Sequence, residues 1–355
     1  MRRFVVAAIV LGVSAAPARA QSGLMESCGQ ATHGHAGLPQ EVTNQFRQMC
    51  AQVVNSFAVL QPGVGIAFSG GNPVLGTGST IGMRLGLMPR VSVSVRGNIA
   101  FAQMPQLFEK YSATIGDGET LSPMARAGIP LTSVQADAAV GVFNGFPFGL
   151  GAVDLLGSVS LVPRVNDIGL SESIVNYGGG ARVGILKQGI LMPGVSISGM
   201  YRRMGKIGFG NISTHPGAIS SDLDNLSFRA VASKGLLMLD LAVGAGYDRY
   251  SSDVEMQWKV NCGTQECRNV NSGNPLTLQD EIKGKLTTST WNVFVNGGLS
   301  LLMLNIVGEI GYQKANDGVS AADLQKAGLS GDQKLTKEAM KNGNFFGSIG
   351  VRLAI

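Results

Sequence analysis

The sequence has few charged residues. Lysine, arginine, aspartate and glutamate together make up 14% of its 355 residues, against about 25% in a typical soluble domain. The mean hydropathy is positive, at +0.19. A soluble protein with so little charge has too few polar side chains to cover its surface. The composition therefore disfavours a secreted β-sandwich or β-helix of this length.

Long apolar runs are also missing. After residue 20, no apolar run reaches the roughly 18 residues that a membrane-spanning helix needs. A chain that is apolar overall but never continuously apolar fits a transmembrane β-barrel, because only alternate residues of each strand face lipid. The sequence therefore predicts membrane-spanning strands and excludes membrane-spanning helices.

Histidine is scarce, with three residues in the whole chain. These are His33, His35 and His215, and none falls in a segment with strand periodicity. Barrel hydrolases need a nucleophile beside a base, or clustered carboxylates. His215 has only Ser213 and Thr214 beside it, too little to define a catalytic triad. We therefore expect no catalytic site, no enzymatic activity, no cofactor and no metal.

The first twenty residues have the features of a secretory signal peptide. Arg2 and Arg3 precede an apolar stretch over 4–15, and Ala18 and Ala20 supply the small residues that signal peptidase requires. We expect cleavage before Gln21, which removes residues 1–20 and sends the chain out of the cytoplasm.

Four cysteines remain in the exported part, an even number that indicates disulfides. Three pairings are possible, and we favour Cys28 with Cys50 and Cys262 with Cys267, because each pair lies within one segment. A metal site built from Cys28, Cys50 and the two histidines between them is the alternative. Its spacing matches no common zinc site.

Residues 21–61 form a segment of their own. Between 38 and 60 the apolar residues are spaced by three or four positions, which indicates one face of a helix. They are Val42, Phe46, Met49, Val53 and Phe57. Pro39 suits the first turn, and Pro62 is expected to end the helix. The segment lies either below the barrel or inside it as a plug.

Residues 62–355 are predicted to form a closed antiparallel β-barrel, because from residue 63 the apolar residues alternate with polar or small ones. In 90–102, for example, Val91, Val93 and Val95 oppose Ser92 and Ser94. The pattern gives twelve strands. They are 63–70, 78–87, 90–102, 132–144, 149–162, 175–187, 193–204, 224–233, 236–250, 285–298, 301–313 and 344–355. Short turns alternate with longer loops at 71–77, 103–131, 163–174, 205–223, 251–284 and 314–343, as in barrels with short periplasmic turns.

The last strand, from Phe345 to Ile355, resembles the C-terminal insertion signal of bacterial outer-membrane β-barrel proteins. It alternates and ends at the final residue, although Ile355 stands where an aromatic residue is usual. The resemblance implies location in the outer membrane, contact with its lipid, and insertion by the barrel-insertion machinery through this strand. A segment ahead of the barrel is also similar to the N-terminal hatch of long-chain fatty-acid transporters. We expect no nucleic-acid partner.

The alternation also predicts a charged barrel interior. The inward residues are Arg84, Arg96, Asp137, Asp154, Arg182, Arg202, Arg229, Asp240, Asp248, Glu309 and Arg352. Such a wall indicates either a charged constriction that selects solutes or a structural network of ion pairs. The arginines and the acids fall largely on different strands, which predicts oppositely charged arcs. We expect a porin-like passive channel or uptake barrel for small solutes. The alternative is a structural or adhesive barrel without transport.

Overall fold

The computed structural model describes residues 24, 26–28, 40–83, 89–105, 114–115, 125–147, 150–163, 173–209, 217–262, 265–272, 274, 276–301, 303–315 and 343–354. Two helices are defined in it, α2 (Gln40–Ser69) and α3 (Gln265–Val270). The strands are β1 (Val91–Pro105), β2 (Thr114–Ile115), β3 (Ala125–Phe143), β4 (Val153–Val162), β5 (Ile174–Leu186), β6 (Gly194–Phe209), β7 (Gly217–Leu236), β8 (Leu239–Cys262), β9 (Leu276–Leu301), β10 (Leu304–Ala315) and β11 (Asn344–Ala354).

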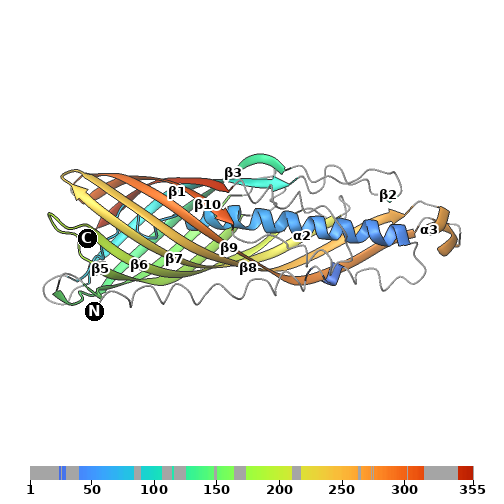
Figure 1. Ribbon diagram of the computed structural model, residues 1–355, viewed down its shortest axis with the longest axis horizontal. Coiled ribbons are helices and arrows are strands. Elements are labelled where there is room, and N and C mark those ends of the chain that lie inside the picture. The colour runs from blue at the N-terminus through green and yellow to red at the C-terminus, as the bar shows by residue number, and fades with distance from the viewer. Residues whose placement is uncertain are drawn as a thin grey trace, which may run out of the picture.

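Ten of these strands form a closed antiparallel barrel (Figure 1). Neighbours along the chain pair with each other from β3 to β11, β1 pairs with both β3 and β11, and the β8–β9 ladder completes the ring. The two-residue β2 adds a parallel pairing to the far end of β8. The expected all-β closed barrel is confirmed, but the expected count of twelve strands is wrong.

The count differs because the first expected strand, 63–70, and the described part of the second, 78–83, form no strand. Residues 63–69 are the end of α2, and 70–82 continue as an irregular segment. Gly63 and Gly65 alternate with Val64 and Ile66, which gave this stretch the period of two that is typical of a strand. In the structure they let α2 approach Ala102 and Tyr250, whose atoms occupy the space that a Cβ would need. Pro62 lies inside α2 and does not end it.

The helix α2 lies along the barrel axis, with its C-terminal part inside the ring of strands (Figure 1). It contacts β1, β3, β4, β8, β9 and β11, which surround it. Of the two positions left open for the N-terminal segment, the structure therefore shows the plug. Among the described residues, no helix is both long and apolar enough to cross a membrane.

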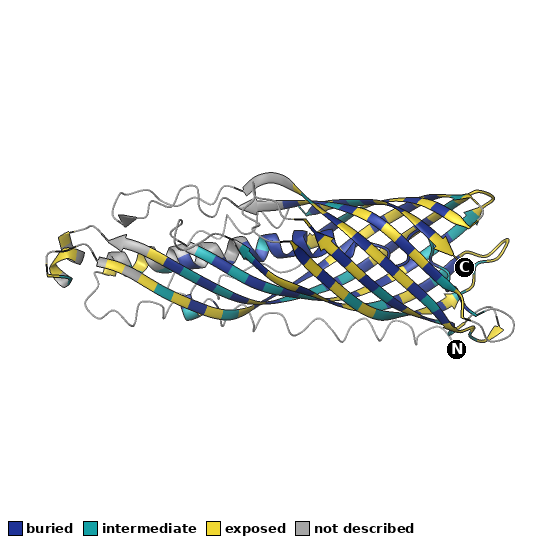
Figure 2. Ribbon diagram, turned by 180° about the vertical axis from the view of Figure 1, so that it is seen from behind, coloured by how far each residue is buried: buried dark blue, intermediate teal, exposed yellow. Residues whose placement is uncertain are grey.

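The strands differ greatly in length. Buried and exposed residues alternate along all of them (Figure 2), but on the longest strands the apolar residues change from the outer to the inner face part-way along. β8 and β9 have 24 and 26 residues, more than twice the roughly 10 that span a bilayer. On β8, Leu241 and Val243 are exposed and face outward, whereas further along Val254 and Met256 are buried and Asp253 faces outward. The expected loop 251–284 is thus largely strand. The sequence pattern was missed there because the apolar residues change to the inner face.

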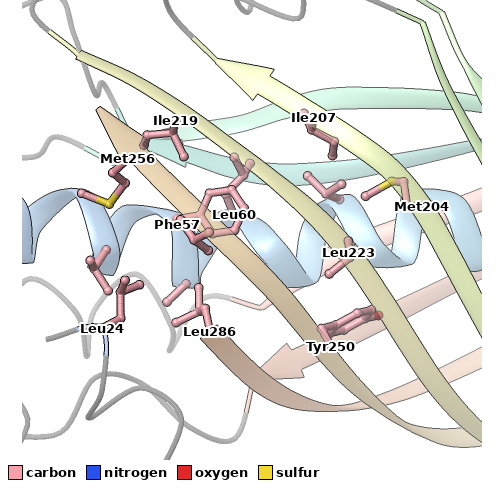
Figure 3. Close-up of a cluster of buried hydrophobic side chains, with 14 of the residues drawn as sticks. Leu24, Phe57, Leu60, Met204, Ile207, Ile219, Leu223, Tyr250, Met256 and Leu286 are labelled. Atoms are coloured by element: carbon pink, nitrogen blue, oxygen red, sulfur yellow. The ribbon is translucent and has the colours of Figure 1, made fainter. Parts of the chain in front are cut away.

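Where the long strands extend past the apolar outer band, the inside of the barrel holds a hydrophobic core like that of a soluble protein (Figure 3). Phe57 and Leu60 of α2 lie among buried side chains of the long strands, including Leu223, Met256 and Leu286. Leu24 is also part of this cluster and contacts Gly284 on β9. The middle of α2, from Cys50 to Leu60, is therefore held by apolar packing inside the extended part of the barrel.

A disulfide joins Cys28 to Cys50, with a Cα–Cα distance of 5.6 Å, as expected. It rules out a metal site that uses both thiolates. The other expected pair lies outside the described side chains, although Cys262 ends β8 and Cys267 belongs to α3.

Removing this disulfide should loosen the N-terminal half of α2. Because the bond closes a loop with a sequence separation of 22, the double variant Cys28→Ala/Cys50→Ala should lose about 3 kcal/mol of local stability. Hydrogen exchange of the α2 amides near Cys50 measures this loss, and the amides of β4 and β5 serve as the internal control. Unchanged protection of α2 would contradict the expectation.

Candidate functional site in the barrel lumen

The charged residues predicted for the interior are placed as follows. Arg84 lies outside the described residues. The side chains of Arg96, Asp137, Asp154, Arg182, Arg202, Arg229, Asp248, Glu309 and Arg352 are buried on the inner wall. Asp240 is partly buried and lies 4.0 Å from Arg352. Most of these groups bind the backbone of residues 69–82, which we call the plug segment. The sequence pattern gave no indication of that partner.

Two wall arginines cap the C-terminal end of α2. The helix carries no basic residue in its last turn, and its final carbonyls have no partner within the helix. Arg96 donates to the carbonyl of Ser69 at 3.2 Å, and Arg229 donates to that of Gly70 at 3.4 Å. Both cations lie at the negative end of the helix dipole, where they stabilise it. Gly70 has φ +59° and ends the helix with a hydrogen bond from its N–H to the carbonyl of Ile66.

A wall carboxylate binds the next two residues. Glu309 accepts hydrogen bonds from the N–H groups of Gly71 and Asn72, both at 2.8 Å. It also accepts one from the side chain of Asn296 at 2.7 Å. Arg229 donates to the carbonyl of Gly71 at 2.8 Å. Both polar groups of the Gly71 backbone are therefore bound by charged wall residues. We call the contacts between charged wall side chains and the backbone of the plug segment the clamp.

Further along the plug segment, an ion pair on β4 and β5 repeats the arrangement. Arg182 and Asp154 lie 2.7 Å apart. Asp154 accepts hydrogen bonds from the N–H groups of Ile81, at 3.0 Å, and Gly82, at 3.3 Å. Arg182 donates to the carbonyl of Thr77 at 3.4 Å. The ion pair therefore fixes the wall and the plug segment at once.

Two arginines complete the set. Arg352 donates to the carbonyl of Leu75. Arg202 instead donates to the hydroxyls of Ser158 and Ser227, at 3.3 and 3.0 Å, on the barrel wall. It is thus a wall cation held by neutral partners.

The charges are paired across adjacent strands. Arg96 on β1 lies 3.1 Å from Asp137 on β3, and Arg229 on β7 lies 2.9 Å from Asp248 on β8. The expected separation into arcs of opposite charge is therefore wrong, because strands that carry arginines adjoin strands that carry acids and their side chains form ion pairs.

The outer surface above the apolar band carries a second charged feature. A groove of about 710 Å³ is lined by Arg203, Lys206, Glu255 and Lys283, among others. Lys206 donates to Glu255 at 2.8 Å. This contact, with Lys283 nearby, lowers the pKa of the Glu255 carboxyl to about 2. The groove is an exposed network of paired charges, of the kind that faces water.

Comparison with known proteins does not assign this chain to a family. No family model and no curated protein matches the chain. The outer-membrane protease OmpT of Escherichia coli is 8% identical, with 75% of this chain and 96% of that chain covered and a TM-score of 0.35. The translocator domain of autotransporter NalP from Neisseria meningitidis is 10% identical, with 75% and 88% covered and a TM-score of 0.34. These likenesses carry no argument about the location or activity of this chain. Its closed antiparallel β-barrel is established by its own strand pairing.

Removing one arginine of the clamp should lower the stability of the barrel. Arg96→Met would leave Asp137 buried without its partner and the Ser69 and Asn72 carbonyls without their donor. We expect a loss of about 3–5 kcal/mol in the free energy of unfolding. Arg203→Met is the matched control, since Arg203 is exposed and lies 3.9 Å from Asp222 and Asp224; it should cost less than about 1 kcal/mol. Equilibrium unfolding in guanidinium measures both, and equal losses would contradict the clamp.

Proposed function

We propose that this protein is a sealed outer-membrane barrel that displays its N-terminal helix and extended strands at the cell surface. In this role it acts as a structural or adhesive element, without catalysis. The observation that supports the proposal most is the clamp: charged wall residues from most of the strands bind the backbone of the plug segment. An open aqueous pore would leave these groups to water instead.

The course of the chain supports display. The short connections, such as Leu237–Met238 between β7 and β8, mark the periplasmic end. The plug segment ends near that end, where Asp154 binds Gly82. The disulfide and Leu24 lie at the opposite end, among the extended strands. The chain therefore crosses the lumen once, and the start of α2 faces the outside of the cell.

A gated uptake barrel is the second candidate, favoured by one observation. Residues 70–82 are held largely by hydrogen bonds and ion pairs, and their removal would uncover a lumen lined by arginines and acids. Such a lumen could pass polar solutes. The two candidates differ in whether the plug segment leaves the barrel.

Conductance across a planar bilayer tests whether the plug segment seals the barrel. The wild-type protein should show no stable open channel, because the plug segment fills the lumen, whereas deletion of residues 40–82 should produce one. The double variant Arg96→Gln/Arg229→Gln, which removes both caps of α2, should flicker open, and Arg203→Gln should remain closed. Heat-modifiable migration on gels confirms that each variant has folded. A wild-type protein that conducts steadily would make the passive channel the better interpretation. Closure of every variant would overturn sealing by the plug.

Surface display has its own test in whole cells. A protease recognition sequence inserted between residues 39 and 40 should be cleaved by protease added to intact cells. The same sequence inserted between Gly145 and Phe146, at the periplasmic end, should be cleaved only after the cells are broken. Protection of the first site in intact cells would place the start of α2 in the periplasm and refute display.

A further inference from the structure

The periplasmic end of the barrel is unusually apolar. The tips of its short connections carry large hydrophobic side chains, which we call the turn rim: Phe146, Leu150, Ile190, Leu191, Leu237, Met238 and Met303. Ile190 and Leu191 are 95% and 92% exposed, and Leu237 is fully exposed, at 106%. Phe146 meets Phe143 with ring centroids 6.1 Å apart, and the other side chains of the turn rim are at least half exposed. In water, tight turns carry polar residues, so the turn rim calls for a different surrounding.

The height of the apolar band indicates what surrounds the turn rim. Outward aromatic residues mark its external edge, where Tyr247 and Trp291 pack with ring centroids 5.0 Å apart. From Trp291, ten residue steps lead to Leu301 at the end of β9, a rise of about 23 Å at about 3.3 Å per residue and a tilt of about 45°. The band that lipid requires is about 25 Å tall. The strands alone do not exceed this height, so the turn rim falls at the inner edge of the hydrocarbon layer.

Three carbonyls of the β5–β6 turn have partners within the protein. The ammonium of Lys234 donates to those of Gly189 at 2.8 Å, Ile190, and Met192 at 3.4 Å. The N–H of Gly189 donates to the carbonyl of Met192 at 3.0 Å. Because an unpaired carbonyl is costly in lipid, these partners suit a turn at the edge of the hydrocarbon layer.

Two other turns bond to the neighbouring strand in the same way. The N–H of Ser300 donates to the carbonyl of Met238 at 2.8 Å, and that of Ala354 donates to the carbonyl of Met303 at 3.3 Å. Each tip therefore presents side chains outward while a carbonyl of its backbone is bound within the barrel.

The backbone of Leu237 adopts an unfavourable conformation. Its φ is +55°, in the left-handed region that favours glycine or asparagine at this position of a two-residue turn. A leucine here is strained, and its side chain gains nothing from the protein. Contact with acyl chains offsets that strain, whereas contact with water adds to it.

The charges beside the turn rim fit the headgroup layer. Lys187 is exposed next to the β5–β6 turn, Lys234 lies over it, and Arg90 is exposed at the start of β1. Cations at this level can reach lipid phosphates while neighbouring apolar side chains enter the acyl layer.

We propose that the turn rim is inserted in the inner leaflet of the outer membrane, with its apolar side chains among phospholipid acyl chains and its cations at the headgroup phosphates. The surface is continuous with the lipid-facing band of the strands. The inference rests on the barrel spanning a bilayer, which is part of the proposed function.

Tryptophan fluorescence in lipid vesicles tests the inference. In a Trp258→Phe/Trp291→Phe background, single tryptophans replace Leu191, Leu237 or, as controls, Val243 in the apolar band and Lys285 outside it. The vesicles contain phosphatidylcholine with or without bromine on its acyl chains. We expect Leu191→Trp and Leu237→Trp to lose most of their emission in brominated lipid, as Val243→Trp does, while Lys285→Trp keeps it.

The outcomes separate the inference from the proposed function. Quenching at Val243→Trp without quenching at the turn rim would overturn the inference and leave the rim in the periplasm, facing water or a protein. An unquenched Val243→Trp would show that the barrel is not in the bilayer, so both would fail.

A second variant keeps the native tryptophans. Leu237→Asn relieves the backbone strain, so it should stabilise the barrel if the turn lies in water. If the turn lies in lipid, it should lower the transition temperature of heat-modifiable migration in vesicles. A stabilised vesicle-bound variant would overturn the inference.

Discussion

The placement of α2 depends on charged wall residues that bind backbone groups inside the lumen. Buried charges are costly unless they are paired, and a helix end buried without partners is costly as well. In this barrel the buried charges and the buried helix end are partners of each other. Arg96 and Arg229 bind carbonyls at the end of α2, and Glu309 binds the turn that follows. The lumen is therefore closed by the same contacts that stabilise its wall.

The barrel has two zones with opposite distributions of apolar and charged residues. In the zone with the apolar outer band, charges face inward, whereas the extended zone has its charges outside and its apolar residues around α2. Helix α2 passes through both zones, held by apolar packing in one and by polar contacts in the other. The disulfide between Cys28 and Cys50 fixes its outer half.

The two ends of the barrel differ in the polarity of their outer surfaces. At the external end the strands outgrow the bilayer and acquire charged outer faces, such as the network of Lys206 and Glu255. At the periplasmic end they stop short, and the turns themselves carry leucines and methionines whose carbonyls are bound within the protein. The barrel is therefore asymmetric, with a short apolar end and a long polar one, and the proposed position in the membrane rests on this asymmetry.

The sequence by itself determined the all-β barrel, ten of its strands and the inward charges, because a strand with one face in lipid alternates with a period of two. It also indicated the first disulfide and the start of α2. It misassigned residues 63–70, where glycines that fit the helix against Ala102 and Tyr250 resemble alternation. Only the tertiary structure decided that α2 enters the lumen and that the wall charges bind backbone carbonyls and N–H groups. Backbone groups are the same at every position, so no residue pattern marks them as partners.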